Sequence, residues 1–157
     1  MSKKFSFSVV VFLLVSFVYA QDHTFSFRGG LLHKTSSYEN AASSTANGLY
    51  MGMQYQFLHF VTSVNYTIST AQGESVSSIY VPLCSKFALA DKLYLIGGPV
   101  FDFSLNAADT ENTHLGYTLG SSYELNNHLS LEAHYSYLFA KESQARQLLV
   151  GVLYQLN

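Results

Sequence analysis

The chain is poor in charge. Only 11% of its 157 residues are Asp, Glu, Lys or Arg, against about 25% in a typical soluble domain. It has one cysteine, Cys84, so it cannot form an internal disulfide or a cysteine-type zinc site. Tryptophan is absent, and amphipathic runs at helical spacing are missing, which argues against a helical fold. The net charge of −2 gives no reason to expect a nucleic-acid partner.

The N-terminal segment is predicted to be a removable leader. Lys3 and Lys4 precede an apolar stretch over residues 5–18, and Val18-Tyr19-Ala20 supplies the small residues of a cleavage site. We interpret residues 1–20 as a signal peptide and 21–157 as one mature domain. The alternative, a membrane anchor, needs ~20 apolar residues, and this stretch has roughly fourteen. The residue directly after Ala20 is Gln21 and not a cysteine, so a lipid anchor is not expected.

Apolar and polar residues alternate at period two in the mature chain. The clearest run has Leu148, Val150, Val152, Tyr154 and Leu156 on one face, which is the pattern of a strand with two different faces. A looser run lies near the start of the mature chain. We expect eight strands, at residues 24–33, 48–57, 59–69, 76–87, 92–105, 113–125, 128–139 and 146–156.

The connections between these strands alternate in length. Tight turns are expected at residues 58–59, 90–91 and 126–127, and polar connections at 34–47, 70–75, 106–112 and 140–145. The first of these, Lys34–Asn47, is rich in Ser, Ala and Asn and is interpreted as a flexible loop. Short turns at one end and longer loops at the other are typical of outer-membrane barrels, with the turns in the periplasm. The chain is therefore predicted to be an all-β, eight-stranded antiparallel up-and-down transmembrane β-barrel.

The strands have one apolar face and one face rich in Gly, Ser, Thr, Gln and His. In a soluble barrel the apolar face turns inward around a ligand, whereas in lipid it turns outward. The small polar residues suit a narrow lumen, which favours lipid. Tyrosines near strand ends fit interfacial girdles; they are Tyr55, Tyr66, Tyr123, Tyr137 and Tyr154. A secreted or periplasmic barrel that binds an apolar ligand remains the alternative.

Five charged residues lie on the polar face and form a candidate lumen charge network: Arg28, Lys86, Asp102, Glu124 and Glu132. They could line an ion pathway or hold a plugged barrel together. Buried charges must be paired, and eight strands leave an interior only wide enough for side chains. We therefore favour the plug, and we expect Arg28 to pair first with Glu132.

The central hairpin resembles a known family. Ile79-Tyr80-Val81-Pro82-Leu83 with Lys86-Phe87, followed by Lys92-Leu93-Tyr94-Leu95 and Gly97-Gly98-Pro99, is similar to the central hairpin of the PorT-like outer-membrane β-barrel domains. Tyr80 stands where that family has an acidic residue. The eight-strand pattern resembles the OmpA/OmpX-type barrels over the whole mature chain.

The C-terminus is similar to the assembly signal of these barrels. Gly151, Tyr154 and Leu156 match it, while Leu149 replaces a polar residue and Asn157 the usual Phe. The resemblance implies the cell outer membrane as the location, outer-membrane lipid and the barrel-assembly machinery as partners, and no defined activity. We expect a monomer with a structural or surface-interaction role, whose extracellular contacts are made through its loops.

One residue pattern suggests an enzyme. His134 and Ser136 share a strand face, with Glu142 nearby, and such groups form a base and a nucleophile. The pattern resembles the His-x-Ser strand of outer-membrane lipid A deacylases. The alternation places both residues in the lumen, away from acyl chains. A lipid-modifying enzyme is therefore a lesser alternative, and we expect no enzymatic activity. The six histidines show no metal-ligand spacing, and no cofactor is expected.

Overall fold

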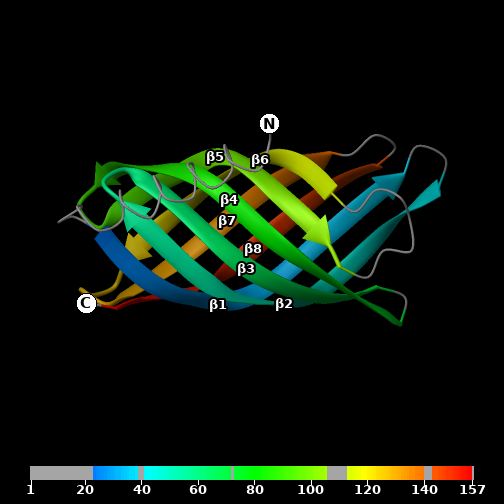
Figure 1. Ribbon diagram of the computed structural model, residues 1–157, viewed down its shortest axis with the longest axis horizontal. Helices are drawn as coiled ribbons and strands as arrows, with labels where there is room; N and C mark the ends of the chain where they lie inside the picture. The colour runs from blue at the N-terminus through cyan, green and yellow to red at the C-terminus, as the bar shows by residue number, and fades with distance from the viewer. Residues whose placement is uncertain (1–22, 39–40, 72, 106–112, 140–142, 157) are drawn as a thin grey trace, which may run out of the picture.

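The protein is a closed antiparallel barrel of eight strands. The structure, a computed structural model, describes residues 23–38, 41–71, 73–105, 113–139 and 143–156. Each strand pairs with its sequence neighbours, and the first pairs with the last (Figure 1). The predicted up-and-down barrel is therefore confirmed. The strands are β1 His23–Tyr38, β2 Ala41–Phe57, β3 Phe60–Ala71, β4 Glu74–Ala90, β5 Leu93–Ser104, β6 Thr113–Glu124, β7 Leu129–Phe139 and β8 Ser143–Leu156.

The prediction of a flexible loop over Lys34–Asn47 is wrong. Residues 34–38 and 41–47 extend β1 and β2, and Thr35 pairs with Thr45. The hydroxyls of Ser37 and Ser43 lie 3.2 Å apart across the two strands. Serine and asparagine are common in loops, but hydroxyl pairs across two strands also stabilise a sheet. Residues 143–145 are likewise in a strand, whereas 106–112 and 140–142 lie outside the described residues.

Two of the tight turns have a residue in the left-handed region: Leu58 with φ 52° and Lys92 with φ 64°. The turn predicted at residues 90–91 lies one residue later, at Asp91-Lys92, since β4 continues to Ala90. The register shift between Ala88 and Ala90 accounts for this, because a bulge adds one residue to its strand. We call the end with these turns the turn end and the opposite end the loop end; the C-terminus lies at the turn end (Figure 1).

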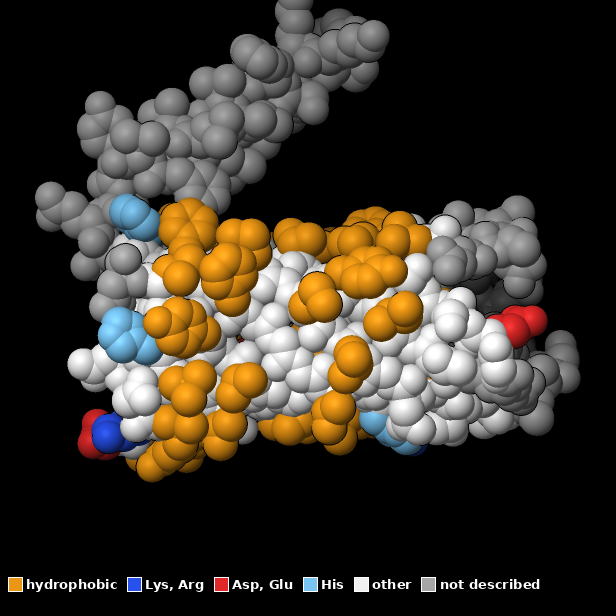
Figure 2. All heavy atoms as spheres, turned by 90° about the horizontal axis from the view of Figure 1, so that it is seen from below, with side chains coloured by type: hydrophobic (Ala, Val, Ile, Leu, Met, Phe, Trp, Pro, Cys, Tyr) orange, Lys and Arg blue, Asp and Glu red, His pale blue; other side chains and the backbone are white. Residues whose placement is uncertain are grey.

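The barrel carries its apolar side chains on the outside. Figure 2 shows them covering much of one face, with polar surface beyond them at the loop end. We call these outward-facing side chains the apolar coat. It includes Phe27 (50% exposed) and Met51 (65%), while the alternating positions Ser26 and Arg28 are buried. Other members are Leu31, Leu49, Val64, Leu83, Leu119, Leu131, Val150 and Val152.

The interior is layered rather than uniformly polar. One apolar cluster lies toward the loop end: Leu32, Tyr50, Tyr80, Val100, Leu138, Ala145 and Leu149. A second cluster, Val61, Cys84 and Ile96, lies toward the turn end. Along β3 the inward residues after Val61 are Ser63 and Asn65, so a polar layer separates the two clusters. Period two already places Leu32 and Leu149 inward, on the face that is otherwise rich in polar residues.

Candidate functional site

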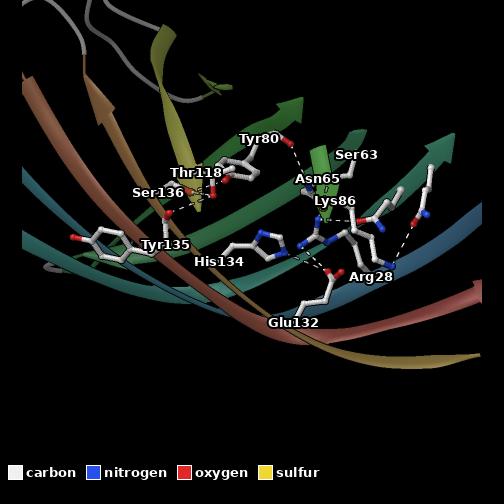
Figure 3. Close-up of polar contacts among 12 residues, drawn as sticks. Arg28, Ser63, Asn65, Tyr80, Lys86, Thr118, Glu132, His134, Tyr135 and Ser136 are labelled. Atoms are coloured by element: carbon white, nitrogen blue, oxygen red, sulfur yellow. Dashed lines mark hydrogen bonds and ion pairs between the residues drawn. The ribbon is translucent and has the colours of Figure 1, made fainter. Parts of the chain in front are cut away.

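The middle of the lumen contains a buried ion pair. Arg28 Nη2 lies 3.1 Å from Glu132 Oε2, and both side chains are 2% exposed (Figure 3). Arg28 also donates to Gln54 Oε1 at 3.3 Å and to Ser63 Oγ at 3.1 Å. His134 Nε2 lies 3.5 Å from the same Glu132 oxygen. Each charged group thus has polar partners, which a charge removed from water requires.

Glycines make room for this pair. Gly151 of β8 is directly opposite Gly30 of β1 on one side and Glu132 of β7 on the other. It has no side chain, so the long side chains of Arg28 and Glu132 can meet over β8. A Cβ built at Gly151 would collide with the Gly29 carbonyl and the Tyr50 hydroxyl. The Tyr50 ring in turn lies 5.5 Å from the Arg28 guanidinium carbon.

The five predicted residues are distributed over three ion pairs instead of one network. Toward the loop end, Lys34 Nζ lies 2.8 Å from Asp102 Oδ2. At the turn end, Lys86 Nζ lies 3.6 Å from Glu124 Oε1 and 4.0 Å from the centre of the Tyr94 ring. Lys34 is not among the five predicted residues, because it lies in the segment expected to be a loop. The alternation continues through Leu32 to Lys34, so the signal was present.

The structure gives Ser136 partners other than His134. Ser136 Oγ donates to Thr118 Oγ1 at 2.9 Å, which leaves the Tyr80 hydroxyl, 2.6 Å away, as the donor to Ser136 (Figure 3). His134 is directed at Glu132. Both residues are buried in the lumen, and Glu142 lies outside the described residues. The described contacts do not form a base–nucleophile pair.

Pairing on both sides of β4 is interrupted at two prolines. Between β3 and β4 the register skips from Thr62–Leu83 to Asn65–Tyr80, around Pro82. Between β4 and β5 it skips from Pro82–Val100 to Ser85–Gly97, around Pro99. Proline has no N–H to give to a ladder. Side chains supply donors instead: the Thr62 hydroxyl bonds the Pro82 carbonyl at 3.1 Å, and the Asn65 amide bonds the Tyr80 carbonyl at 3.1 Å.

The reactivity of Cys84 measures how firmly β4 is held in the barrel. The thiol is 3% exposed, in the cluster with Val61 and Ile96. We expect maleimide to modify folded barrel at least about a thousandfold more slowly than unfolded chain, because exposure requires unfolding that costs ~5 kcal/mol or more. Mass spectrometry of timed samples measures the rate. A labelling rate that does not rise with added urea would contradict this and would show that β4 opens locally at its prolines.

The C-terminal positions that resemble an assembly signal lie on opposite faces. Gly151 faces the lumen, while Tyr154 and Leu156 are in the apolar coat, 52% and 39% exposed. The Tyr154 ring stacks at 6.1 Å with His128 near the turn end. Leu149 is fully buried in the loop-end cluster, which explains an apolar residue at that point.

The described part of the chain contains no group of three or more His, Cys, Asp or Glu residues placed to hold a metal ion. Nor does it contain a helix long and apolar enough to cross a bilayer.

Comparison with known proteins identifies the fold. No protein-family model and no curated protein sequence matches the chain. Neisserial surface protein A is similar in structure, with a TM-score of 0.71 and 18% identity over 84% of this chain and 97% of that one. The attachment invasion locus protein Ail of Yersinia pestis has a TM-score of 0.64 and 14% identity, covering 87% and 100%. A designed transmembrane β-barrel gives 0.58 and 16%, covering 85% and 95%. The chain therefore has the fold of small transmembrane β-barrels.

Proposed function

We propose that this protein is a monomeric structural barrel of the bacterial outer membrane that presents its loop end to the outside. The inverted surface is the observation that carries the proposal. Large apolar side chains are exposed on every strand, as in Leu31 (66%) and Leu119 (56%), while Arg28 and Glu132 are buried. Water would penalise such a surface, whereas lipid requires it. The closed ring pairs its strands without a free edge, which a bilayer also requires.

A plugged lumen is part of the proposal. Two apolar layers lie on either side of the Arg28–Glu132 pair, and an ion crossing the barrel would have to pass both of them without water. An eight-stranded barrel has little space beyond that needed for its side chains. We therefore assign the function to the barrel as a scaffold and to its loop end, and not to a conducting path through the lumen.

The two alternative functions have less support. A soluble carrier of an apolar ligand needs its apolar face inward, and the structure has that face outward. A lipid-modifying enzyme of the His-x-Ser type needs a histidine against Ser136, and the described partners of Ser136 are Tyr80 and Thr118.

The PorT-like resemblance and the leader over residues 1–20 complete the proposal. After cleavage near Ala20, the barrel-assembly machinery would receive a chain that carries Gly151, Tyr154 and Leu156 near its C-terminus. Surface interaction would use the loop end, where the β1–β2 hairpin carries a ladder of exposed hydroxyls: Ser37, Ser43 and Thr45.

Membrane location has a direct test. We expect the mature protein to fractionate with outer membranes and to migrate faster on a gel unheated than boiled, because its closed hydrogen-bonded ring resists detergent.

The orientation of the barrel can be tested with protease. Protease added to intact cells should spare Lys92, at the turn end. It should also spare Lys34, which is held in a strand by Asp102. Recovery as a soluble monomer from a periplasmic extract would overturn the proposal, and cleavage at Lys92 alone would reverse the orientation.

A further inference from the structure

The outer face of the barrel carries one unusual charge. Between the hairpin tips, Arg146 on β8 is the only Lys, Arg, Asp or Glu side chain described on the outer face. Toward the turn end it is followed by Leu148 (40% exposed), Val150 and Val152 of the apolar coat. Toward the loop end it is followed by the exposed Gln144. Arg146 thus lies at the border of the coat, and in Figure 2 the charged side chains of the visible face lie outside the coat.

The neighbours of Arg146 form a continuous row across four strands. Arg146 pairs with Tyr137 of β7 and Thr35 of β1, and Tyr137 pairs with Tyr117 of β6. The two tyrosine rings stack at 5.8 Å and 20°. We call Tyr117, Tyr137, Arg146 and Thr35 the border row. It passes from aromatic to cationic to hydroxyl side chains around the barrel, and tyrosine is enriched where a membrane meets water.

Beside the row, Gln144 adds a hydrogen-bond donor, whereas the Nδ1 donor of His33 is already used. The Tyr137 hydroxyl donates to Gln144 Oε1, so the amide NH₂ of Gln144 is left to face outward. His33, diagonal to Arg146 on β1, is held by Asn47 Oδ1 at 2.7 Å from its Nδ1. Arg146 itself has no ion-pair partner among the described residues. The cluster therefore offers cationic and neutral donors without a described carboxylate to neutralise them.

We propose that Arg146 of the border row and the neighbouring Gln144 amide bind the phosphate of a lipid headgroup in the outer leaflet. Guanidinium groups bind phosphate through paired, charge-assisted hydrogen bonds. Lipid is favoured over a soluble polyanion because Arg146 lies next to Leu148 of the apolar coat, where the proposed membrane would change from acyl chains to headgroups. This inference rests on the proposed outer-membrane function.

The test uses the mature chain refolded in micelles of a maltoside detergent, which carries no phosphate, with lipid binding counted by native mass spectrometry. The probes are lipid A with both of its phosphates and the same lipid without them. Wild type is expected to bind the phosphorylated probe more tightly. Arg146→Gln should weaken that binding by about tenfold or more, because a charged hydrogen bond contributes ~1.5 kcal/mol or more and 1.4 kcal/mol corresponds to tenfold. Arg146→Lys should recover part of the loss.

Lys92→Gln is the matched control, since it removes one exposed positive charge at the turn end and should bind like wild type. Equal binding of the two lipids by wild type, or unchanged binding by Arg146→Gln, would overturn the inference. So would displacement of the lipid by millimolar inorganic phosphate, or tighter Arg146-dependent binding of a heparin fragment. A chain that never acquires the fast-migrating form in any membrane mimic contradicts the proposed function, whereas a folded chain without phosphate preference contradicts only the lipid site.

Discussion

Arg28→Leu is expected to destabilise the barrel by about 3–5 kcal/mol, the cost of leaving one member of a buried ion pair without its partner. Glu132 is 3% exposed, so water cannot replace the guanidinium. Gln54 and Ser63 would lose their donor as well. The free energy of unfolding can be measured by urea titration in vesicles, with loss of the fast-migrating form as the signal.

The double variant Arg28→Leu with Glu132→Leu should recover most of that loss, because two apolar side chains replace two charges at once. Lys86→Met is the matched single variant at the turn end, where Glu124 is 34% exposed. The free energy of unfolding of Lys86→Met should fall by ~1 kcal/mol or less, as for ion pairs in contact with water. Equal losses for Arg28→Leu and Lys86→Met would show that burial does not set the energy of the central pair.

The same variants test whether the lumen is plugged. Neither wild type nor Arg28→Leu should conduct ions in planar bilayers, since the two apolar layers remain in both. A current in wild type that Arg28→Leu changes would favour a pore and reject the plug.

Alternation predicted the direction of side chains far better than it predicted their contacts. The side of each strand follows from period two alone, so Arg28 and Glu132 could be placed in the lumen. Their pairing also followed, because β8 is the only strand between β1 and β7 in a closed ring. Lys34 and Asp102 meet across the lumen from β1 and β5, and that contact depends on strand stagger, which the sequence does not reveal.

The ends of the strands were hardest to predict for a different reason. Serine and threonine occur both in loops and in exposed ladders, and only pairing distinguishes the two. The Thr35–Thr45 pair exists because the β1–β2 hairpin continues past the apolar coat, where alternation of apolar and polar residues stops. The sequence shows Pro82 and Pro99, and proline interrupts strand pairing. That both interruptions flank β4 follows only from the strand register.

Gly151→Ala is expected to destabilise the barrel by about 3 kcal/mol or more, at the upper end for overpacking. The new methyl group would meet the Gly29 carbonyl and the Tyr50 hydroxyl. The Gly29 carbonyl belongs to the backbone of β1 and cannot rotate away. Relief would require β1 to move away from β8, which breaks the pairing that closes the ring. Gly97→Ala is the matched control, because its methyl group would point outward and lie 3.3 Å from a Leu119 methyl, which can rotate away. That variant should change stability by about 0.5 kcal/mol or less.

Comparing Gly151→Ala in purified refolding and in cells separates two roles for Gly151. If it acts by packing, Gly151→Ala fails equally in purified refolding and in cells. If it acts only as part of an assembly signal with Tyr154 and Leu156, the purified variant refolds like wild type and fails only where the assembly machinery must recognise it. We expect the packing outcome, because the new methyl group would clash with the backbone of β1 when β8 closes against it. The assembly machinery meets the chain before that closure, when neither face of β8 is enclosed. A clash that forms only at closure therefore acts in purified refolding and in cells alike.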